Sequence, residues 1–412
     1  MNHSQIRDLK QTSDVEIKGN IKSKISTFFH KERKLIDKNI PFGRVDILFL
    51  IYSVILLLFG MLMNYSASMV YAEQMYDDST YFLVRYAIFS VISIGVTYFF
   101  VKKATLTFIY KASRWMYVAT IFMLALVLVI GTVGGGAQRW IRIGPITVQP
   151  SEIAKLAVVL MLSAHLFDNA EKVTSTKRGG GSLLHGVIIP GGIIGLVCAL
   201  IALEKHISGL MIIAMLGASI MFVGGTRLKY IGALGLTVVM AGVLLIFVSE
   251  YAQTRVNTWL NIDTVDPLGE AWQTLQGLYA IGSGGFFGRG LFNSLCKHGY
   301  VSQPQNDFVF AIVCEELGFI GALLVVLLFA MLVTRGIKIA LRVPNKFGAL
   351  VVMGLVIKIG LQAALNIAVV TNSMPNTGIS LPFFSSGGTS LALQIFEIGI
   401  VLNISRYSRI KS

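Results

Sequence analysis

Asp307 is the acid best placed for chemistry in this chain. It stands directly before an apolar run that begins at Phe308, and no other acid occurs between Glu270 and Glu315. A lone carboxylate at the edge of a polar site can act as a general base that removes a proton from a hydroxyl. Asp is also a preferred N-terminal cap of a helix, so its position alone leaves both roles open.

Cationic side chains gather in a second stretch, between residues 136 and 155. Arg139 and Arg142 follow a glycine-rich run, and Glu152 and Lys155 lie three residues apart just after Pro150. Guanidinium and ammonium groups are the natural partners of a diphosphate. The same residues also fit an ordinary helix start, with proline at the first position and a lysine that snorkels to the surface.

Two further stretches are rich in glycine and poor in charge. The first covers residues 282–290 and resembles a phosphate loop only superficially, because it lacks a Gly-Lys-Ser/Thr sequence. We interpret it as irregular backbone, permitted by glycine and packed against the membrane domain. The second covers residues 372–390, holds no charged residue, and is interpreted as the wall of an outer cavity.

The elements that carry these residues are predicted to be membrane helices. The 412 residues are 54% hydrophobic and 14% charged, with a mean hydropathy of +0.71. A soluble domain carries about 25% charged residues, so the composition favours an all-α, polytopic membrane protein. The three cysteines imply neither a disulfide framework nor a metal cluster.

Ten runs are long and apolar enough to be membrane-spanning helices. The predicted spans are 46–66, 81–101, 115–134, 150–167, 184–203, 207–224, 229–249, 308–333, 347–371 and 384–404. They define a membrane domain over residues 46–405, with one large loop at 250–307 between the seventh and eighth helices. Residues 1–45 form a basic tail predicted to be disordered, and residues 406–412 form a short tail.

The distribution of Lys and Arg predicts the orientation. With the N-terminus in the cytoplasm, 26 of the 35 basic residues fall on the inner side, six on the outer side and three within spans. Basic residues favour cytoplasmic loops, so both termini are expected inside and loop 250–307 outside. The net charge of +14 is explained in this way without a nucleic-acid partner.

Seven ionisable residues lie within spans or at their edges, where a charge is costly. They are Arg85, Glu152, Lys155, Glu315, Glu316, Lys358 and Glu397. Ion pairs between helices would explain them, and a polar cavity for a charged headgroup is the alternative. Glu315 and Glu316 are expected to be structural.

Taken together, these motifs resemble the SEDS family, which includes the FtsW, RodA and SpoVE proteins. The matching blocks are Gly-Ala-Gln-Arg-Trp-Ile at 136–141, Gln-Pro-Ser-Glu-x-x-Lys at 149–155, Gly-Arg-Gly at 288–290, Asp-Phe-Val-Phe-Ala at 307–311, Glu-Glu-Leu-Gly at 315–318, Pro-x-Thr-Gly-x-x-Leu-Pro-Phe at 375–383 and Ser-Gly-Gly at 386–388. The tail and the block at 314–318 look more like the division and sporulation branch than RodA.

The resemblance implies a peptidoglycan glycosyltransferase of the bacterial cytoplasmic membrane, acting at the division septum. Such an enzyme polymerises lipid II onto a nascent glycan carried by polyprenyl diphosphate, with a class B penicillin-binding protein and other division proteins as partners. The resemblance makes Asp307 the catalytic residue and places Arg139, Lys155 and Gln303 at the substrate. A divalent cation, Mg²⁺ or Mn²⁺, could assist, although the sequence contains no evident set of ligands for it.

Two departures from the family pattern matter. Many members carry a glutamate where this chain has Gln303, which argues against a mechanism with two carboxylates. Many also read Gln-Pro-Asp-x-Gly-Thr where this chain has Glu204-Lys205-His206-Ile207-Ser208-Gly209, so no site is transferred there. A lipid II flippase and a non-catalytic division scaffold remain as alternatives to the enzyme.

Overall fold

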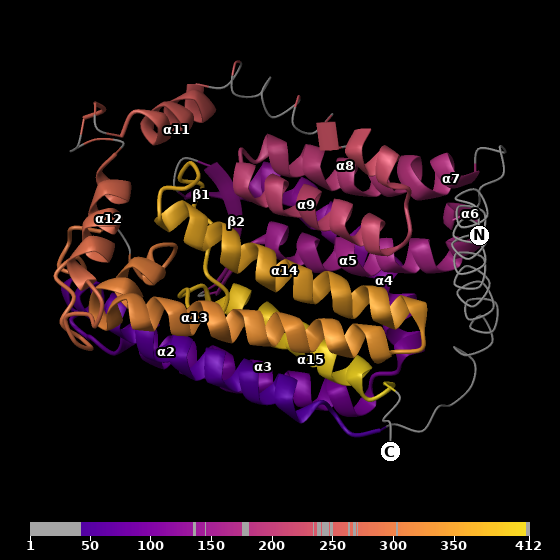
Figure 1. Ribbon diagram of the computed structural model, residues 1–412, viewed down its shortest axis with the longest axis horizontal. Coiled ribbons are helices and arrows are strands. Elements are labelled where there is room, and N and C mark those ends of the chain that lie inside the picture. Colours follow the sequence, from indigo (N-terminus) through magenta and orange to yellow (C-terminus); the bar gives the residue numbers. More distant parts are fainter. Residues whose placement is uncertain are drawn as a thin grey trace, which may run out of the picture.

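The computed structural model describes residues 43–134, 137–144, 146–174, 181–233, 250–262, 271–301 and 304–408, with a few single residues between 235 and 269. The predicted N-terminal tail lies almost entirely outside the described residues. The described chain is a bundle of long helices that run side by side (Figure 1).

Eight helical segments in the described chain are long and apolar enough to cross a membrane. They are α2 (Ile47–Tyr76), α3 (Tyr81–Lys103), α4 (Leu106–Ile130), α5 (Pro150–Asp168), the segment Leu184–Leu203 that contains α8 (Ile189–Leu203), α13 (Val309–Arg342), α14 (Lys346–Val370) and α15 (Gly388–Ser405). A further apolar helix, α9 (Ile207–Val223), has 17 residues. The predicted span 229–249 lies largely outside the described residues, so the count of ten stays a prediction.

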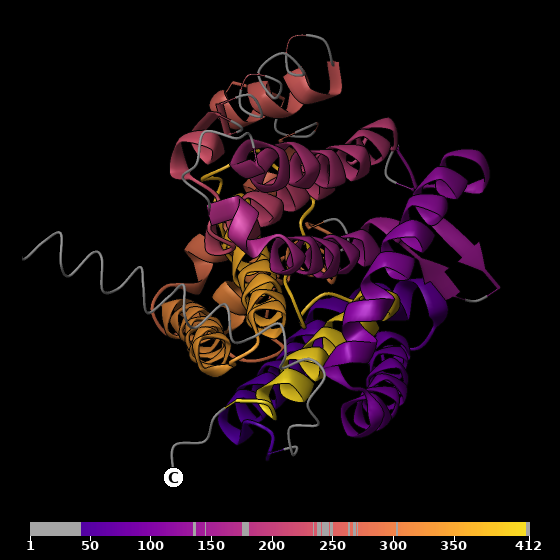
Figure 2. The ribbon, with the colours of Figure 1, turned by 90° about the vertical axis from the view of Figure 1, so that its right-hand side faces the viewer.

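The predicted third span was misplaced at both ends. The helix begins at Leu106, nine residues before the expected start, because the Thr105 hydroxyl accepts a hydrogen bond from the Phe108 amide and caps it. It ends at Ile130, and residues 132–134 belong to a small antiparallel sheet. The sheet contains β1 (Thr132–Gly134), β2 (Ala137–Ile143) and β3 (Ile146–Val148) in that order, and it was not predicted. Figure 2 shows it at one edge of the bundle.

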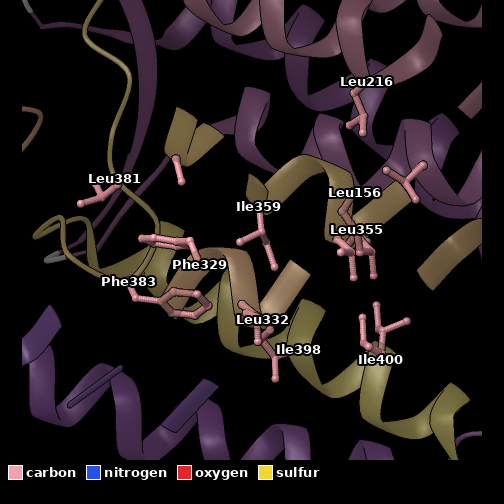
Figure 3. Packing of buried hydrophobic residues seen from close by; sticks show 14 of the residues in the cluster. Leu156, Leu216, Phe329, Leu332, Leu355, Ile359, Leu381, Phe383, Ile398 and Ile400 are labelled. Atoms are coloured by element: carbon pink, nitrogen blue, oxygen red, sulfur yellow. The ribbon is translucent and has the colours of Figure 1, made fainter. Parts of the chain in front are cut away.

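The buried core lies between α5, α9, α13, α14 and α15. Figure 3 shows Leu156, Leu355 and Ile400 meeting there, beside Leu332 and Ile359. By contrast, α2, α3 and α4 carry many exposed apolar side chains, as expected of helices that face lipid. The helices α5 and α14 are among the most buried, and they carry Glu152, Lys155, Gln362 and Asn366, which are discussed below.

Of the seven ionisable residues in or near spans, only Lys358 and Glu397 form an ion pair between two described helices, as the first of the two interpretations expected. The Lys358 ammonium on α14 donates to both Glu397 carboxylate oxygens on α15 at 2.7 Å. The Lys155 ammonium lies 2.7 Å from Glu152 on the same face of α5. Arg85 is partly buried, with its guanidinium 5.9 Å from the Phe89 ring centre. Because burying an unpaired charge costs several kcal/mol, the Lys358–Glu397 pair favours the packing of α14 against α15, whereas the Lys155–Glu152 pair acts within α5.

The helix α13 is broken at Gly318, and the glycine-rich stretch fills the break. Gly318 has a φ of 65°, a conformation that favours glycine. The loop follows α12 (Trp272–Gly284), and its carbonyl oxygens at Gly285 and Phe286 accept hydrogen bonds from the Phe319 and Ile320 amides. A Cβ atom at Gly288 would lie 2.2 Å from the Glu316 carbonyl oxygen. Residues 285–290 are therefore irregular backbone packed against a membrane helix, as predicted, whereas residues 282–284 form the last turn of α12.

The buried carboxylates of Glu315 and Glu316 bind residues 292–297 of the predicted outer loop. The Glu316 carboxylate accepts hydrogen bonds from the Phe292 amide, at 3.0 Å, and from the Ser66 hydroxyl, at 2.6 Å. It also forms a buried ion pair with Lys297 at 3.2 Å. The Glu315 carboxylate accepts a hydrogen bond from the Leu295 amide at 2.9 Å. Residues 292–297 are thus tied to α13, in agreement with the structural role predicted for both acids.

The substitution Glu316→Gln should destabilise the protein. It leaves the buried Lys297 ammonium without its counter-ion, and removing one partner of a buried pair costs about 3–5 kcal/mol. The expected result is a lower yield of folded protein and a lower midpoint of thermal unfolding in detergent.

The matched control is Glu73→Gln, which makes the same chemical change at an exposed position of α2. It should leave both quantities unchanged. If Glu316→Gln unfolds at the same temperature as the control, these contacts do not contribute measurably to stability.

Candidate functional site

Asp307 lies just before α13 but does not cap it. The cap position is Phe308, and no side chain makes a capping hydrogen bond there, so the interpretation of Asp307 as a helix cap is wrong. The Asp307 side chain is partly exposed. Burial of its carboxylate raises the pKa of Asp307 to about 6, and the charge of Arg255, on α11 (Glu250–Leu260), opposes that rise. A carboxylate with this pKa is mostly ionised at neutral pH and still basic enough to accept a proton.

The uncharged segment 377–380 lies directly beside Asp307. A Cβ atom on Gly378 would be 3.5 Å from the Asp307 carboxylate. The Asn366 side-chain amide on α14 donates to the backbone carbonyls of both Asp307, at 2.8 Å, and Ile379, at 2.6 Å. One side chain therefore sets the spacing between the candidate base and this segment.

Lys155 is connected to segment 377–380 through the Gln362 side chain on α14. Its ammonium lies 3.4 Å from the Gln362 side-chain oxygen, and the Gln362 amide donates to Ser380. Lys155 is only 2% exposed, so the expectation of a lysine that snorkels to the surface is wrong. The described contacts place its charge inside the protein, paired with Glu152.

Arg139 is brought to this end of the bundle by β2. Its guanidinium donates to the backbone carbonyl of Lys205 at 3.0 Å, and its Nε atom is buried without a hydrogen-bond partner. Arg142 is exposed, and its Nε atom contacts the Gly144 carbonyl oxygen at 3.4 Å. Only one of the two sheet arginines is therefore joined to the rest of the site.

The turn between α8 and α9 holds two functional candidates that sequence reasoning missed. Glu204 is 1% exposed and His206 is 7% exposed. Neither carboxylate oxygen of Glu204, nor Nδ1 of His206, has a hydrogen-bond partner. Burial raises the pKa of Glu204 to about 7, and it lowers the pKa of His206 to about 3, helped by Arg139. An acid and a histidine between two apolar runs were the signal available in the sequence.

These side chains form one group at the end of the bundle that is predicted to face outside, and we call it the outer polar cluster. The charges of Arg139, Glu152 and Lys155 all act on His206. The α8–α9 turn also reaches the segment beside Asp307, because the Ser208 hydroxyl donates to the Thr377 carbonyl. The members of the cluster are Arg139, Glu152, Lys155, Glu204 and His206.

Other expected site residues are placed less fully. Gln303 lies outside the described residues, so its expected role at the substrate stays a prediction. Its neighbour Gln305 is anchored through its backbone carbonyl by Asn64 on α2 and by the Ser386 amide. Among the described residues, no three His, Cys, Asp or Glu side chains gather as metal ligands. Because Mg²⁺ is usually bound by one or two carboxylates together with substrate phosphates, the assisting Mg²⁺ or Mn²⁺ ion stays a prediction.

Comparisons with known proteins agree on one family. The family model FTSW_RODA_SPOVE, described as "Cell cycle protein", matches residues 46–410. The chain is 38% identical over 367 residues to stage V sporulation protein E of Bacillus subtilis, covering 88% of this chain and 98% of that protein. It is 34% identical over 369 residues to a Geobacter sulfurreducens protein named "Probable peptidoglycan glycosyltransferase FtsW", covering 88% and 95%.

Solved structures show the same fold. A chain from a study of the structural coordination of polymerization and crosslinking by a peptidoglycan synthase complex superposes with a TM-score of 0.71 at 24% identity. It covers 89% of this chain and 99% of that one. The rod shape determining protein RodA of Thermus thermophilus superposes with a TM-score of 0.65 at 23% identity, covering 89% and 98%. With the family model matching nearly the whole membrane domain, this chain is a multi-pass membrane protein that belongs to the FtsW/RodA/SpoVE family.

Proposed function

We propose that this chain is a peptidoglycan glycosyltransferase that polymerises lipid II into β-1,4-linked glycan strands at the outer face of the cytoplasmic membrane. Family membership and the glycosyltransferase name of several relatives support the reaction class. The observation that carries the proposal is the Asp307 carboxylate, partly exposed beside segment 377–380 and not used as a helix cap.

The proposed reaction joins an incoming lipid II to the growing glycan. The 4-hydroxyl of the GlcNAc of lipid II attacks the anomeric carbon of the MurNAc at the reducing end of the chain. Asp307 accepts the hydroxyl proton as the new C–O bond forms, and the bond to polyprenyl diphosphate breaks with inversion from α to β. A carboxylate with a pKa of about 6 is suited to this step, because it is ionised at neutral pH before the attack.

Arg139 and Lys155 are proposed to stabilise the negative charge that builds on the departing diphosphate. Arg139 retains a buried donor, Nε, with no partner in the protein. Lys155 is paired with Glu152, so its contribution is that of a fixed charge near the segment beside Asp307. Gln303 is proposed to bind the substrate through a neutral amide where many relatives carry a carboxylate.

The same proposal includes topology, location and partners. Both termini would lie in the cytoplasm, with tail 1–45 inside and loop 250–307 outside. The protein would act at the division septum. The basic residue distribution supports the orientation. The similarity to a chain from a complex that coordinates polymerization and crosslinking supports a crosslinking partner, a class B penicillin-binding protein. Other division proteins would complete the assembly.

The substitution Asp307→Asn should abolish most polymerisation while leaving the fold intact, because it keeps the side-chain volume and removes the base. We expect the rate of glycan synthesis from purified lipid II, with the partner transpeptidase present, to fall at least about 10²-fold. In the unmodified protein, the rate should fall as pH drops below about 6, where the Asp307 carboxylate becomes protonated.

The control for this experiment is Asp77→Asn, at an exposed position on the outer end of α2. It should polymerise normally. Near-normal synthesis by Asp307→Asn would overturn the assignment of Asp307 as the catalytic base. Absence of synthesis by the unmodified protein would instead favour the flippase or the scaffold.

The substitution Arg139→Ala should weaken use of the lipid-linked substrate. Losing a charge-assisted hydrogen bond of about 1.5–3 kcal/mol corresponds to a decrease in kcat/KM of roughly tenfold to a hundredfold. Arg139→Lys should recover only part of the loss, because the bidentate guanidinium becomes a point charge. Lys155→Ala should also lower kcat/KM.

Arg142→Ala is the matched control, since Arg142 lies on the same strand but is exposed and points to Gly144. It should leave kcat/KM unchanged. If Arg142→Ala and Arg139→Ala have equal effects, the arginines act only through general surface charge.

A single cysteine at Tyr300, in a background without Cys198, Cys296 and Cys314, tests the orientation. Tyr300 is 51% exposed in the predicted outer loop, so an impermeant thiol reagent added to intact spheroplasts should label it. A cysteine at Lys338, exposed near the predicted inner end of α13, should be labelled only after the membrane is opened. The reverse pattern would contradict an outward-facing polymerase.

A further inference from the structure

Glu204 is unlike the other buried acids in the described part of the chain. Each of the others, which are Glu152, Glu315, Glu316 and Glu397, has at least one carboxylate oxygen bound by a lysine, a hydroxyl or a backbone amide. Glu204 is 1% exposed, and neither of its oxygens has a hydrogen-bond partner. An unsatisfied buried carboxylate is costly, and it points to a ligand or a proton that the group takes up in use.

Arg139 is the charged group that acts on Glu204. It favours the ionised carboxylate, and it is held against the same turn by its hydrogen bond to the Lys205 carbonyl. Lys205 has a φ of 55°, uncommon for a residue with a side chain, so the turn presents this carbonyl at some cost in backbone energy. The Arg139 guanidinium, which is proposed to bind diphosphate, therefore acts on Glu204, an acid to which the family resemblance assigns no role.

The charges around Glu204 come from four elements. Arg139 belongs to β2, and Lys205 and His206 belong to the turn itself. From α5, Glu152 and Lys155 act on His206, while Lys358 of α14 acts on Glu152. Lys205 is exposed to solvent, and Lys358 is already paired with Glu397 on α15.

The outer polar cluster therefore carries no net charge when Glu204 is ionised. Arg139 and Lys155 supply two positive charges, and Glu152 and Glu204 supply two negative charges. His206 is neutral, because its pKa is lowered to about 3. A diphosphate placed at Arg139 would compete with the Glu204 carboxylate for the same cation and would be repelled by it. Protonation of Glu204 removes this repulsion and leaves the cluster with one net positive charge.

We propose that Glu204 takes up one proton when the diphosphate of the lipid-linked substrate binds at Arg139. This inference rests on the proposed function for its choice of substrate. The step is a simple protonation: one proton moves from solvent to a Glu204 oxygen, and no other bond forms or breaks. The carboxylic acid can then donate a hydrogen bond to a phosphate oxygen, which an ionised carboxylate cannot do.

The proposal determines the sign of a pH dependence. The pKa of Glu204 in the free protein is about 7, and a neighbouring diphosphate raises it further. Substrate affinity should therefore be constant below pH 7 and should fall as pH rises above 7, by at most about tenfold per pH unit. This dependence is opposite in direction to the loss of rate below pH 6 expected from Asp307.

The test measures binding of lipid II to the full-length Asp307→Asn protein in nanodiscs between pH 6.5 and 8.5. This background prevents turnover and removes the titration of Asp307. The diphosphate of lipid II is a diester with no proton to exchange in this range. We expect the Kd to rise at least about fivefold across the range. Calorimetry in two buffers of different ionisation enthalpy should show net proton uptake on binding at pH 7.5.

Adding Glu204→Gln should make the Kd independent of pH within about twofold, with tighter binding than its parent at pH 8.5. Adding Glu73→Gln instead, which neutralises an exposed acid, should preserve the pH dependence. A flat Kd with intact Glu204, no proton uptake, or an unchanged slope in Glu204→Gln would each overturn the inference.

The calorimetric result does not depend on whether Glu204→Gln folds, because it uses the native glutamate. Failure of this inference is also separable from failure of the proposed function. If the Kd does not change with pH but the protein with native Asp307 polymerises lipid II, only the proposed role of Glu204 is overturned. If binding is linked to proton uptake but no polymerisation is seen, the role of Glu204 stands and the glycosyltransferase proposal is overturned. Absence of lipid II binding at every pH would overturn both.

Discussion

The need to hydrogen-bond irregular backbone packed among helices is the constraint on which the site depends. Backbone groups that leave a helix and lie away from water lose their solvent partners, so protein side chains must bind them. Segment 377–380 meets this constraint through Ser208, Gln362 and Asn366, which come from α9 and α14 and bind three of its carbonyls. Asn366 also binds the carbonyl of Asp307, and Gln362 contacts Lys155. The contacts that satisfy the backbone of this segment are thus the ones that connect it to the candidate base and to the buried cation.

The break in α13 follows the same constraint with a different solution. At Gly318 the helical hydrogen bonds are interrupted, and carbonyls from residues 285 and 286 replace the missing acceptors. Glu315 and Glu316, just before the break, bind the amides of the loop that leads toward Asp307. Because these carboxylates are buried and hydrogen-bonded, they stabilise a loop whose glycines leave its backbone conformationally permissive. The outer loop and the membrane helix are therefore one structural unit.

The buried charged groups are of two kinds, those that are paired and those that keep atoms without a hydrogen-bond partner. Lys358 and Glu397, or Lys297 and Glu316, are fully compensated and connect helices or loops. In the outer polar cluster, by contrast, Glu204, His206 and Arg139 keep atoms without partners. Leaving such groups unsatisfied lowers stability, so a cluster of them at one end of the bundle marks the place where the protein exchanges hydrogen bonds with something else. Under the proposed function, this occupant is the lipid-linked saccharide.

The sequence by itself determined the membrane class, the approximate positions of the helices and the identity of Asp307, Arg139 and Lys155 as candidates. These follow from local properties, namely the length of apolar runs and short motifs. The start of α4, the small sheet and the break at Gly318 were not predictable in the same way, since each depends on a cap, a strand pairing or a loop from elsewhere in the chain. The burial of Lys155 and the unpartnered carboxylate of Glu204 were likewise decided only by the tertiary structure. Whether a charged side chain reaches water, a counter-ion or neither depends on which helices pack around it, and no local pattern of residues specifies that packing.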